Sequence, residues 1–553
     1  MNNGKKTFMR SFKIAVISAV AVSFFNTAFG QGEIEDKVVI IEKERKLDLP
    51  EANRNFEKVH FDVKTPPAKP QEYKLEEVKL NLPSLPSKIK LLMMPDEPLK
   101  KFYGNYVKAG FGNYGTPYLE AFINSKRSEK YLYGLHYKHY SSKNGPVGKS
   151  LSGMSDNLAE AYGKYFTSNQ VISGGIGYSR MRFNYYGGDE NLLKFQDIKQ
   201  VYQLFNVNAG IENLDKTNQI SYNLGLNYYH LSDRFKAKEG EFLADFNGVY
   251  KLDEDRKVNV GAILSLSNRK DSSKVNRAFF ILKPSYSMVM DKIRLNLGFN
   301  VAYTNDSVKS VKGVHLYPNL KAEYDVVDKQ LIAYAGLDGE MQKNTLRKFV
   351  YDNPYLGNNA AILHTNKSIE FFVGAKGHVI GKLNYNARFS YQNYKNLYFF
   401  NNGNPDTSRF VTLYDKGNTS LTQLTGELSY DVSKELLVEY KLNYYGYNVS
   451  DFEYAWERPS FYTSFSGRYN LEKKIFINVD IYYISGLKAK NFVKNEVVKL
   501  KSITDLNLKV EYRFSPAFSA FLEFNNILSK KYQRYLYYPV KGINVLGGLT
   551  YSF

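Results

Sequence analysis

The residue types that most readily bind metals or act as nucleophiles are sparse in this sequence, which has seven histidines and no cysteine. His136 and His139 are the closest histidine pair, and on a strand a spacing of three puts them on opposite faces. Zinc needs several ligands that converge on one point, and the sequence offers no such set. We therefore expect no metal site and no cofactor.

Two glycine-containing strings resemble nucleotide-binding motifs. Gly110–Gly115 matches G-x-G-x-x-G, but a dinucleotide site needs a helix next, and Thr116-Pro117 with an alternating segment behind it predicts a hairpin turn. Gly145–Ser150 is similar to a phosphate-binding loop, but Lys143 stands where that motif requires its first glycine. Neither string predicts a nucleotide site, and we expect that the protein is not an enzyme.

The elements that would position side chains here are β-strands. Between Ile293 and Tyr303 every second residue is large and apolar, and the residues between them are polar or small. Successive side chains on a strand point to opposite faces, so this segment has one apolar and one polar face. The same alternation recurs over residues 220–228, 475–483, 506–514 and 543–553. Residues 104–553 therefore predict an all-β architecture.

The composition excludes two other classes of chain. The mean hydropathy of −0.43 leaves too little apolar sequence for a set of membrane-spanning helices, which need about 20 apolar residues each. Aromatic residues make up 15% of the chain, which a disordered chain would lack. Of the 47 tyrosines only Tyr73 precedes residue 103, so tyrosine belongs almost wholly to the β-rich segment.

Residues 1–30 predict a secretory signal peptide. Four bases precede the apolar run from Ile14 to Phe25, and Ala28 and Gly30 place small residues where a signal peptidase cleaves. The mature chain is expected to begin near Gln31 and to work outside the cytoplasm. The formal charge is +20, of which residues 1–30 carry +4 and residues 104–553 carry +16, because acids and bases cancel in residues 31–103. Since the chain is exported, we expect this charge to face a polyanionic surface such as lipopolysaccharide or an anionic solute, and we expect no nucleic-acid partner.

Residues 31–103 do not predict a globular domain. Eight of the 17 prolines fall between Pro50 and Pro98, and proline fixes φ and removes a backbone donor. This composition predicts an extended, proline-rich N-terminal segment in the periplasm or the lumen. Such a segment suits binding to a periplasmic or lumenal protein partner.

Residues 104–553 predict about 22 strands joined alternately by short and long connections; a count of 20 or 24 also fits the pattern. Short charged turns such as Asp291-Lys292 and Glu472-Lys473 interleave with longer connections such as Lys343–Ala361 and Asn448–Pro459. Short periplasmic turns and long external loops are typical of outer-membrane barrels, whose apolar faces meet lipid. We expect an antiparallel up-and-down transmembrane β-barrel in the outer membrane of a Gram-negative bacterium. The alternative, a soluble propeller, would carry a repeated blade motif that is absent.

The end of the chain supports this prediction. The last alternating segment ends with Tyr551 and Phe553 on its apolar face. A terminal aromatic residue on an amphipathic strand is the pattern that outer-membrane insertion machinery recognises by pairing with a strand edge. We therefore expect the barrel-assembly machinery to be a partner during insertion.

Several segments resemble parts of TonB-dependent receptors. Phe524–Tyr532, Tyr538-Pro539 and Gly548–Phe553 are similar to the closing hairpin of those barrels, and Asn353–Leu356 is similar to another recurring stretch. The resemblance implies a 22-strand barrel over residues 104–553. Residues 31–103 lack the globular pattern of the plug domain that those receptors carry, so the chain resembles a receptor-type barrel without that domain.

Candidate functional residues follow from strand parity and from loops rich in lysine and tyrosine. Aromatic and basic side chains suit stacking and contact with anions. The predicted lumen-facing candidates are Arg294, Asn296, Asn300, Asn478, Asp480, Lys509, Glu511 and Arg513. The predicted external-loop ligand candidates are Lys488, Lys490, Lys531, Tyr532, Arg534 and Tyr535. For any single lumen residue, hydration of the wall or pairing with a neighbour is the simpler interpretation.

Two functions remain open from the sequence. The first is a porin-like or receptor-type role in binding a solute and passing it across the outer membrane, which the closing hairpin favours. The second is a scaffold or conduit in an outer-membrane assembly or secretion complex, in which residues 31–103 would hold the partner.

Overall fold

The structure, a computed structural model, describes residues 104–126, 128–188, 197–215, 217–379 and 382–553. The predicted signal peptide and the predicted proline-rich segment lie outside the described residues. The compact unit considered below is the one that runs from Glu97 to Phe553. In the described part of the chain, no helix is both long and apolar enough to cross a membrane.

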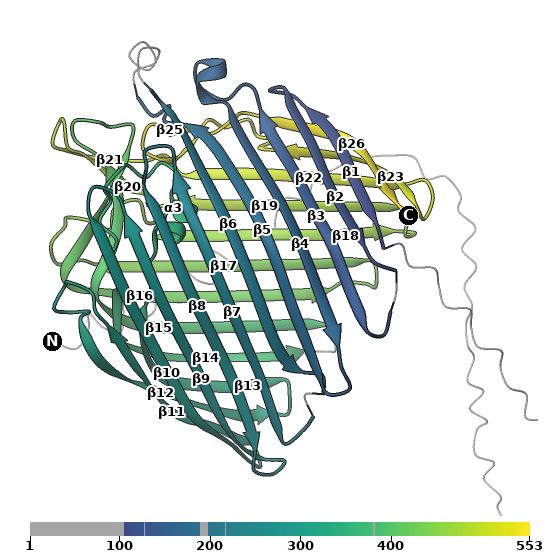
Figure 1. Cartoon of the computed structure of the whole chain (residues 1–553), viewed down its shortest axis with the longest axis vertical. Coiled ribbons are helices and arrows are strands. Elements are labelled where there is room, and N and C mark those ends of the chain that lie inside the picture. The colour runs from purple at the N-terminus through teal and green to yellow at the C-terminus, as the bar shows by residue number, and fades with distance from the viewer. Residues whose placement is uncertain (1–103, 127, 189–196, 216, 380–381) are drawn as a thin grey trace, which may run out of the picture. The chain divides into compact units, whose positions relative to one another are not determined.

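The described residues form one closed antiparallel sheet of 22 strands (Figure 1), as the alternation predicts. Each strand pairs with its neighbour along the chain, and β1 also pairs with β26 from Tyr106↔Ser552 to Gly112↔Leu546. The strands of the barrel are β1 (Tyr106–Gly112), β2 (Thr116–Asn124), β3 (Tyr131–Ser142), β4 (Met154–Phe166), β5 (Gln170–Asn184), β6 (Lys199–Asn213), β7 (Ile220–Asp233), β8 (Lys238–Lys251), β9 (Arg256–Lys270), β10 (Lys274–Met290), β11 (Ile293–Thr304), β12 (Gly313–Val327), β13 (Leu331–Gln342), β14 (Thr365–Val379), β15 (Leu383–Asn402), β16 (Phe410–Asp431), β17 (Leu436–Asn448), β18 (Phe461–Leu471), β19 (Ile475–Ser485), β22 (Ile503–Arg513), β23 (Phe518–Asn525) and β26 (Asn544–Ser552).

The two faces of the wall have opposite chemistry. On β11, Leu297 and Phe299 are 44% and 47% exposed on the outer face, whereas Asn300 on the inner face is 2% exposed. Large apolar side chains are exposed in the same way on the outer faces of most strands. A continuous exposed apolar band of this kind needs lipid as its solvent.

The connections differ between the two ends of the barrel. At the end that holds the start of β1, the turns are short: β10 ends at Met290 and β11 begins at Ile293. At the other end the loops carry their own elements, which are η1 (Lys149–Ser152), α3 (Leu346–Asp352), β20 (Lys488–Asn491), β21 (Glu496–Lys499), β24 (Gln533–Tyr535) and β25 (Tyr538–Pro539). The glycine string at residues 110–115 is the predicted turn, with Tyr114 and Gly115 at φ 64° and 62°.

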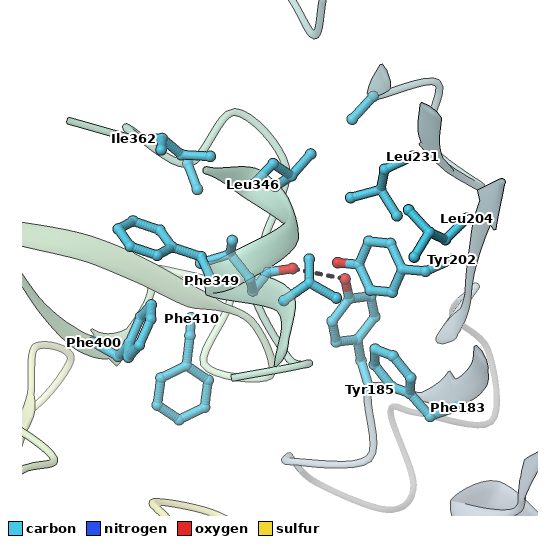
Figure 2. Close-up of a cluster of buried hydrophobic side chains, with 14 of the residues drawn as sticks. Phe183, Tyr185, Tyr202, Leu204, Leu231, Leu346, Phe349, Ile362, Phe400 and Phe410 are labelled. Atoms are coloured by element: carbon cyan, nitrogen blue, oxygen red, sulfur yellow. Dashed lines mark hydrogen bonds between the residues drawn. The ribbon is translucent and has the colours of Figure 1, made fainter. Parts of the chain in front are cut away.

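The main buried cluster lies on the inner side of the wall. Phe183 on β5, Tyr202 and Leu204 on β6, and Leu231 on β7 face inward at the loop end and are buried. Figure 2 shows Leu346, from the connection between β13 and β14, on the side of these residues, whereas the Phe349 ring of the same connection points toward the Phe400 side; all belong to one buried cluster. The inner face is therefore apolar at this end, where a loop folds inward and covers these side chains.

Candidate functional site

The connection between β13 and β14, residues 343–364, is called the cap below. Its helix α3 begins at a Thr345 cap, whose Oγ1 accepts a hydrogen bond from Lys348 N at 3.1 Å. The Glu239 carboxylate on β8 accepts hydrogen bonds from Leu346 N at 2.8 Å and Arg347 N at 3.0 Å. A carboxylate at the amino end of a helix satisfies donors that have no partner inside the helix. The barrel wall thus holds the first turn of α3.

The cap reaches the opposite part of the wall as well. The Phe349 ring lies 4.5 Å from Tyr398 and 5.6 Å from Phe400, both on β15. Tyr398 Oη donates to an Asp352 carboxylate oxygen at 2.9 Å, and Tyr185 Oη donates to the Leu356 carbonyl at 2.8 Å. Because β5 and β8 lie far from β15 around the closed sheet, these contacts carry the cap across the lumen.

Three loops meet at a group of tyrosines on the cap. Tyr355 and Tyr538 stack with ring centroids 3.6 Å apart, and Tyr186 packs edge-on against both. Tyr355 and Tyr538 belong to the two separate segments that resemble TonB-dependent receptors. The structure therefore gives those distant segments one shared role, which is to join the cap to the closing loop.

A cavity of about 620 Å³, called the vestibule pocket below, opens beside the cap. Aromatic side chains from the inner wall dominate its lining, and the loop between β17 and β18 and strand β24 complete it. The lining residues used below are Asp352, Tyr398, Phe400, Tyr445, Tyr447, Trp456, Glu457, Arg458, Arg534 and Tyr535. Apolar walls with a few converging polar groups are typical of small-molecule sites.

Glu457 is the unusual polar group of this pocket. One carboxylate oxygen accepts a hydrogen bond from Leu536 N at 3.2 Å, and the other, Oε2, has no partner among the described residues. Burial raises the pKa of the Glu457 carboxyl to about 8, so the group is largely protonated at neutral pH. A neutral carboxylic acid can donate a hydrogen bond to a ligand, which a carboxylate cannot.

Two arginines flank that acid. Arg534 Nη1 donates to the Glu457 carbonyl at 3.0 Å, and Arg458 Nη2 donates to the Tyr398 carbonyl at 2.8 Å. The Arg458 guanidinium lies 5.0 Å from the Tyr398 ring centroid and 5.2 Å from that of Phe399. Contact with ring faces and carbonyls stabilises both guanidiniums while leaving further N–H donors for a ligand.

The external-loop candidates divide between the pocket and the rest of the loops. Arg534 and Tyr535 line the pocket, whereas Lys488 lies 3.4 Å from the Tyr454 ring centroid and Lys490 pairs with Glu453 at 3.0 Å. Tyr532 is buried and hydrogen-bonded to Asp505, and Lys531 is exposed.

Sequence reasoning missed most of the pocket, including Trp456 and Glu457. The available signal was aromatic residues at inner-face positions near the loop ends of β15 and β17, where a polar lumen would not need them.

The lumen-facing candidates lie on the inner wall, and most of them contact other residues of the wall. The Arg294 guanidinium contacts both Asp325 oxygens at 2.7 and 2.8 Å. Other contacts are Asn296 with Ser287 at 2.9 Å, Asn300 with the Gly339 carbonyl at 2.7 Å, Asp480 with Ser466 at 2.6 Å, Lys509 with Glu523 at 3.9 Å, and Arg513 over the Phe476 ring at 4.6 Å. Asn478 pairs in register with Lys509, and Glu511 with Phe476.

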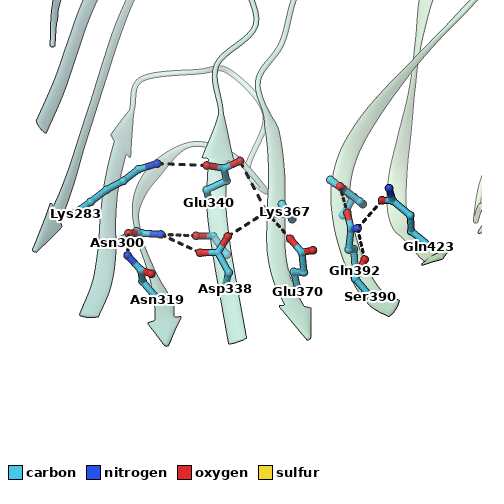
Figure 3. A network of polar contacts seen from close by, with 12 residues as sticks. Lys283, Asn300, Asn319, Asp338, Glu340, Lys367, Glu370, Ser390, Gln392 and Gln423 are labelled. Carbon is cyan, nitrogen blue, oxygen red and sulfur yellow. Dashed lines mark hydrogen bonds and ion pairs between the residues drawn. The ribbon is translucent and has the colours of Figure 1, made fainter. Parts of the chain in front are cut away.

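A denser network follows the inner faces of β10 to β16 (Figure 3). Lys367 lies at its centre, with Nζ 2.8 Å from Glu370, 3.2 Å from Asp338 and 3.9 Å from Glu340. Lys283 also pairs with Glu340, at 3.4 Å. Such mutual pairing compensates the burial of charge in the wall and leaves few of these groups free for a solute.

Metal-binding chemistry is not evident in the described ranges. No group of three or more histidine, aspartate or glutamate residues there is arranged to hold a metal ion. His136 and His139 point to opposite faces, as predicted: His136 contacts Glu120 at 3.1 Å, and His139 contacts Asn157 at 2.7 Å.

No family model and no curated protein matches the chain. Solved structures do match. The FrpB iron transporter from Neisseria meningitidis is 13% identical, with 82% of each chain covered and a TM-score of 0.64. The fold is that of the TonB-dependent siderophore-receptor barrels. The ferric enterobactin receptor of Pseudomonas aeruginosa (12% identity, 82% and 81% covered, TM-score 0.61) and the ferric-catecholate import receptor Fiu of E. coli K12 (9%, 82% of each chain, 0.61) have it too.

The matched proteins are named as transporters and receptors. The receptor-type barrel also matches the fold of Gram-negative outer-membrane receptors, as the two-faced wall predicts. At these identities the likeness concerns the fold, and the vestibule pocket has to be interpreted from its own residues.

Proposed function

We propose that this protein is an outer-membrane receptor that binds a solute in the vestibule pocket and passes it through the lumen when the cap moves. The observation that carries the proposal is the cap itself. An open pore needs no segment across its lumen, whereas a selective receptor needs both a closure and a pocket beside it. The cap supplies the closure, and the aromatic, arginine-flanked cavity supplies the pocket.

The chemistry of the pocket favours a planar, anionic solute. Tyrosine and tryptophan rings offer stacking faces, and two arginines offer charge-assisted donors. The similar barrels include proteins named for ferric enterobactin and ferric catecholates, and a catecholate is both aromatic and anionic. Ferric enterobactin is therefore the first probe to test.

The chain provides its own reporter for this test. Trp456 is the only tryptophan of the 553 residues, and it is buried in the lining of the pocket. Binding of ferric enterobactin to the purified protein in detergent micelles should quench its fluorescence in a saturable way. Arg534→Gln should weaken binding about tenfold, because it removes a charge-assisted contact, whereas Lys531→Gln on the exposed loop should not.

The assay also identifies failure. Quenching that does not saturate, or that is the same in Arg534→Gln and Lys531→Gln, would show that ferric enterobactin does not bind in the vestibule pocket. Trp456→Phe should abolish the signal while leaving binding measurable by calorimetry.

The scaffold alternative makes a different prediction. A scaffold would co-purify from native membranes with a stoichiometric partner, and its planar-bilayer conductance would not respond to solute. Deletion of residues 31–100 tests a separate proposal, in which residues 31–103 fill the lumen or hold a periplasmic partner. A large stable conductance that is the same with and without this segment would reject its role as a plug. Contacts with lipopolysaccharide and with the barrel-assembly machinery remain proposals of the same kind.

A further inference from the structure

A second cavity, called the loop pocket below, lies between the cap and the loop end of β9 and β10. Its volume is about 310 Å³. The side chains that matter here are Arg269 on β9, Arg277 on β10, Asp271, Asp306 and the Asn359 segment of the cap. No aromatic residue lines it, in contrast to the vestibule pocket.

The two arginines converge by strand geometry. Arg277 pairs in register with Ser267, and Arg269 lies two residues further along β9, so the two side chains are diagonal neighbours on one face. That face is the inner one, because it also carries the buried Ser265 and Phe279. Diagonal neighbours lie close enough for both guanidiniums to contact one small ligand.

The acids of the loop pocket are occupied by other donors. The Asp271 carboxylate pairs with Arg269 Nη2 at 3.2 Å and also accepts from Asn359 N at 2.9 Å. The Asp306 carboxylate accepts from His364 N at 2.8 Å and from Ser307 N at 2.7 Å. These bonds fasten the cap to the loop between β9 and β10 and to the loop between β11 and β12.

The arginines retain unused donors. The Arg269 Nε atom is buried and has no hydrogen-bond partner among the described residues. The Arg277 guanidinium makes no hydrogen bond or ion pair with any described side chain, although it lines the same cavity. A guanidinium has five donors in a planar fork, and leaving them unsatisfied in a partly buried site costs free energy that an anion would offset.

We propose that the loop pocket binds a phosphorylated or carboxylated monosaccharide. The unused guanidinium donors fit the oxygens of a phosphate or carboxylate. Serine and asparagine side chains, among them Ser272, Asn276 and Asn305, supply partners for hydroxyl groups. The volume holds roughly ten water molecules at about 30 Å³ each, which is the size of one sugar rather than of a bare anion. Because no aromatic side chain lines the loop pocket, we expect its ligand to differ from the planar solute proposed for the vestibule pocket.

Calorimetry on the purified full chain in detergent micelles tests the proposal, with glucose 6-phosphate and glucose as probes. Glucose 6-phosphate should bind at one site, at least about tenfold more tightly than glucose, with an affinity that falls as salt is added. Arg277→Gln should weaken that binding about tenfold or more. Arg277→Lys keeps the positive charge but loses the planar pair of donors, so its affinity should lie between those of the unchanged protein and Arg277→Gln.

Arg234→Gln is the matched control, because Arg234 is an arginine of the same end of the barrel that already pairs with Asp197 at 2.6 Å. Heat-dependent migration in SDS gels verifies that each variant is a folded barrel. A second arm replaces the free sugar with vesicles that contain lipopolysaccharide bearing phosphorylated or dephosphorylated sugars. Binding of free glucose 6-phosphate identifies a soluble ligand, and binding only of phosphorylated vesicles identifies the membrane sugar. If neither binds, or if Arg277→Gln and Arg234→Gln bind alike, the proposal is wrong.

Discussion

Replacing Phe349 with alanine should release the cap from the lumen while leaving the barrel intact. The Phe349 side chain is 0% exposed and packs against Tyr398 and Phe400. Truncating a buried phenylalanine costs about 3–5 kcal/mol. Phe349 belongs to α3 and to no strand of the wall, so the loss falls on the docking of the cap rather than on the sheet.

That loss sets the size of the expected effect. Each 1.4 kcal/mol changes an equilibrium constant tenfold, so the undocked fraction should rise at least about a hundredfold. The chain contains no cysteine, and a single thiol can therefore report on the cap without background. Ala360 is 8% exposed within the buried cluster, and Ala360→Cys is a small change there.

The assay is the rate at which an impermeant maleimide labels the protein with Cys at position 360. When opening is fast relative to labelling, this rate follows the undocked population. Adding Phe349→Ala should raise it by about two orders of magnitude. Phe299→Ala makes the same chemical change on the outer face and should leave it unaltered.

Two results would refute the reasoning. Equal rates with and without Phe349→Ala would mean that the packing does not hold the cap. If the protein that carries Ala360→Cys alone is labelled as fast as a fully exposed thiol, the cap is not docked. Unchanged heat-dependent gel migration is needed to attribute faster labelling to the cap.

Three further changes have expected outcomes. Raising the pH from 6 to 9 should shift Trp456 emission, because ionisation of Glu457 disfavours its buried position. The pKa of Glu457 is about 8 in the docked loop and 4.5 when the group is exposed. The contribution of the protonated acid to docking is therefore complete below about pH 4.5 and falls by about 1.4 kcal/mol per pH unit up to about pH 8. Glu457→Gln should remove that dependence, and a shift that persists would assign it to another group. Glu239→Gln should speed labelling of the cap thiol about tenfold or more, because its two bonds to α3 lose their charge; no change would show that the helix does not depend on them. Lys367→Met should destabilise the barrel by about 3–5 kcal/mol, visible as unfolding at a lower temperature in SDS gels, whereas Lys441→Met on a half-exposed pair should have little effect; equal effects would contradict the role of the network.

The strands of the wall and their two faces could be predicted from the sequence, whereas the cap and the pocket inside the barrel could not. Strand periodicity is local, so Leu297 and Phe299 indicate their outer face without any knowledge of their neighbours. The same parity placed Arg294 and Asn300 on the inner face, where Arg294 contacts Asp325 and Asn300 contacts the Gly339 carbonyl.

The cap and its pocket could not be predicted in this way. Tyr185 meets the Leu356 carbonyl across 171 positions of sequence, and Glu457 meets Leu536 across 79. No repeating sequence pattern relates residues so far apart, because the side chains of a loop that turns inward do not alternate as those of a strand do. The sequence offered only an indirect signal. Tyr202, Leu204 and Leu231 are large, mainly apolar residues at inward-facing positions, where a water-filled lumen would favour polar ones, and the cap that covers them explains their presence.

Both ends of the cap continue directly into neighbouring wall strands, β13 and β14. A lumenal segment tethered in this way is present at a fixed effective concentration, whatever the abundance of the protein or of its partners. Its return to the lumen is a short loop closure with a small entropic cost, so each opening should be brief and self-limiting. An undocked cap therefore stays attached to the wall at both of its ends, and it can dock again without help from a partner.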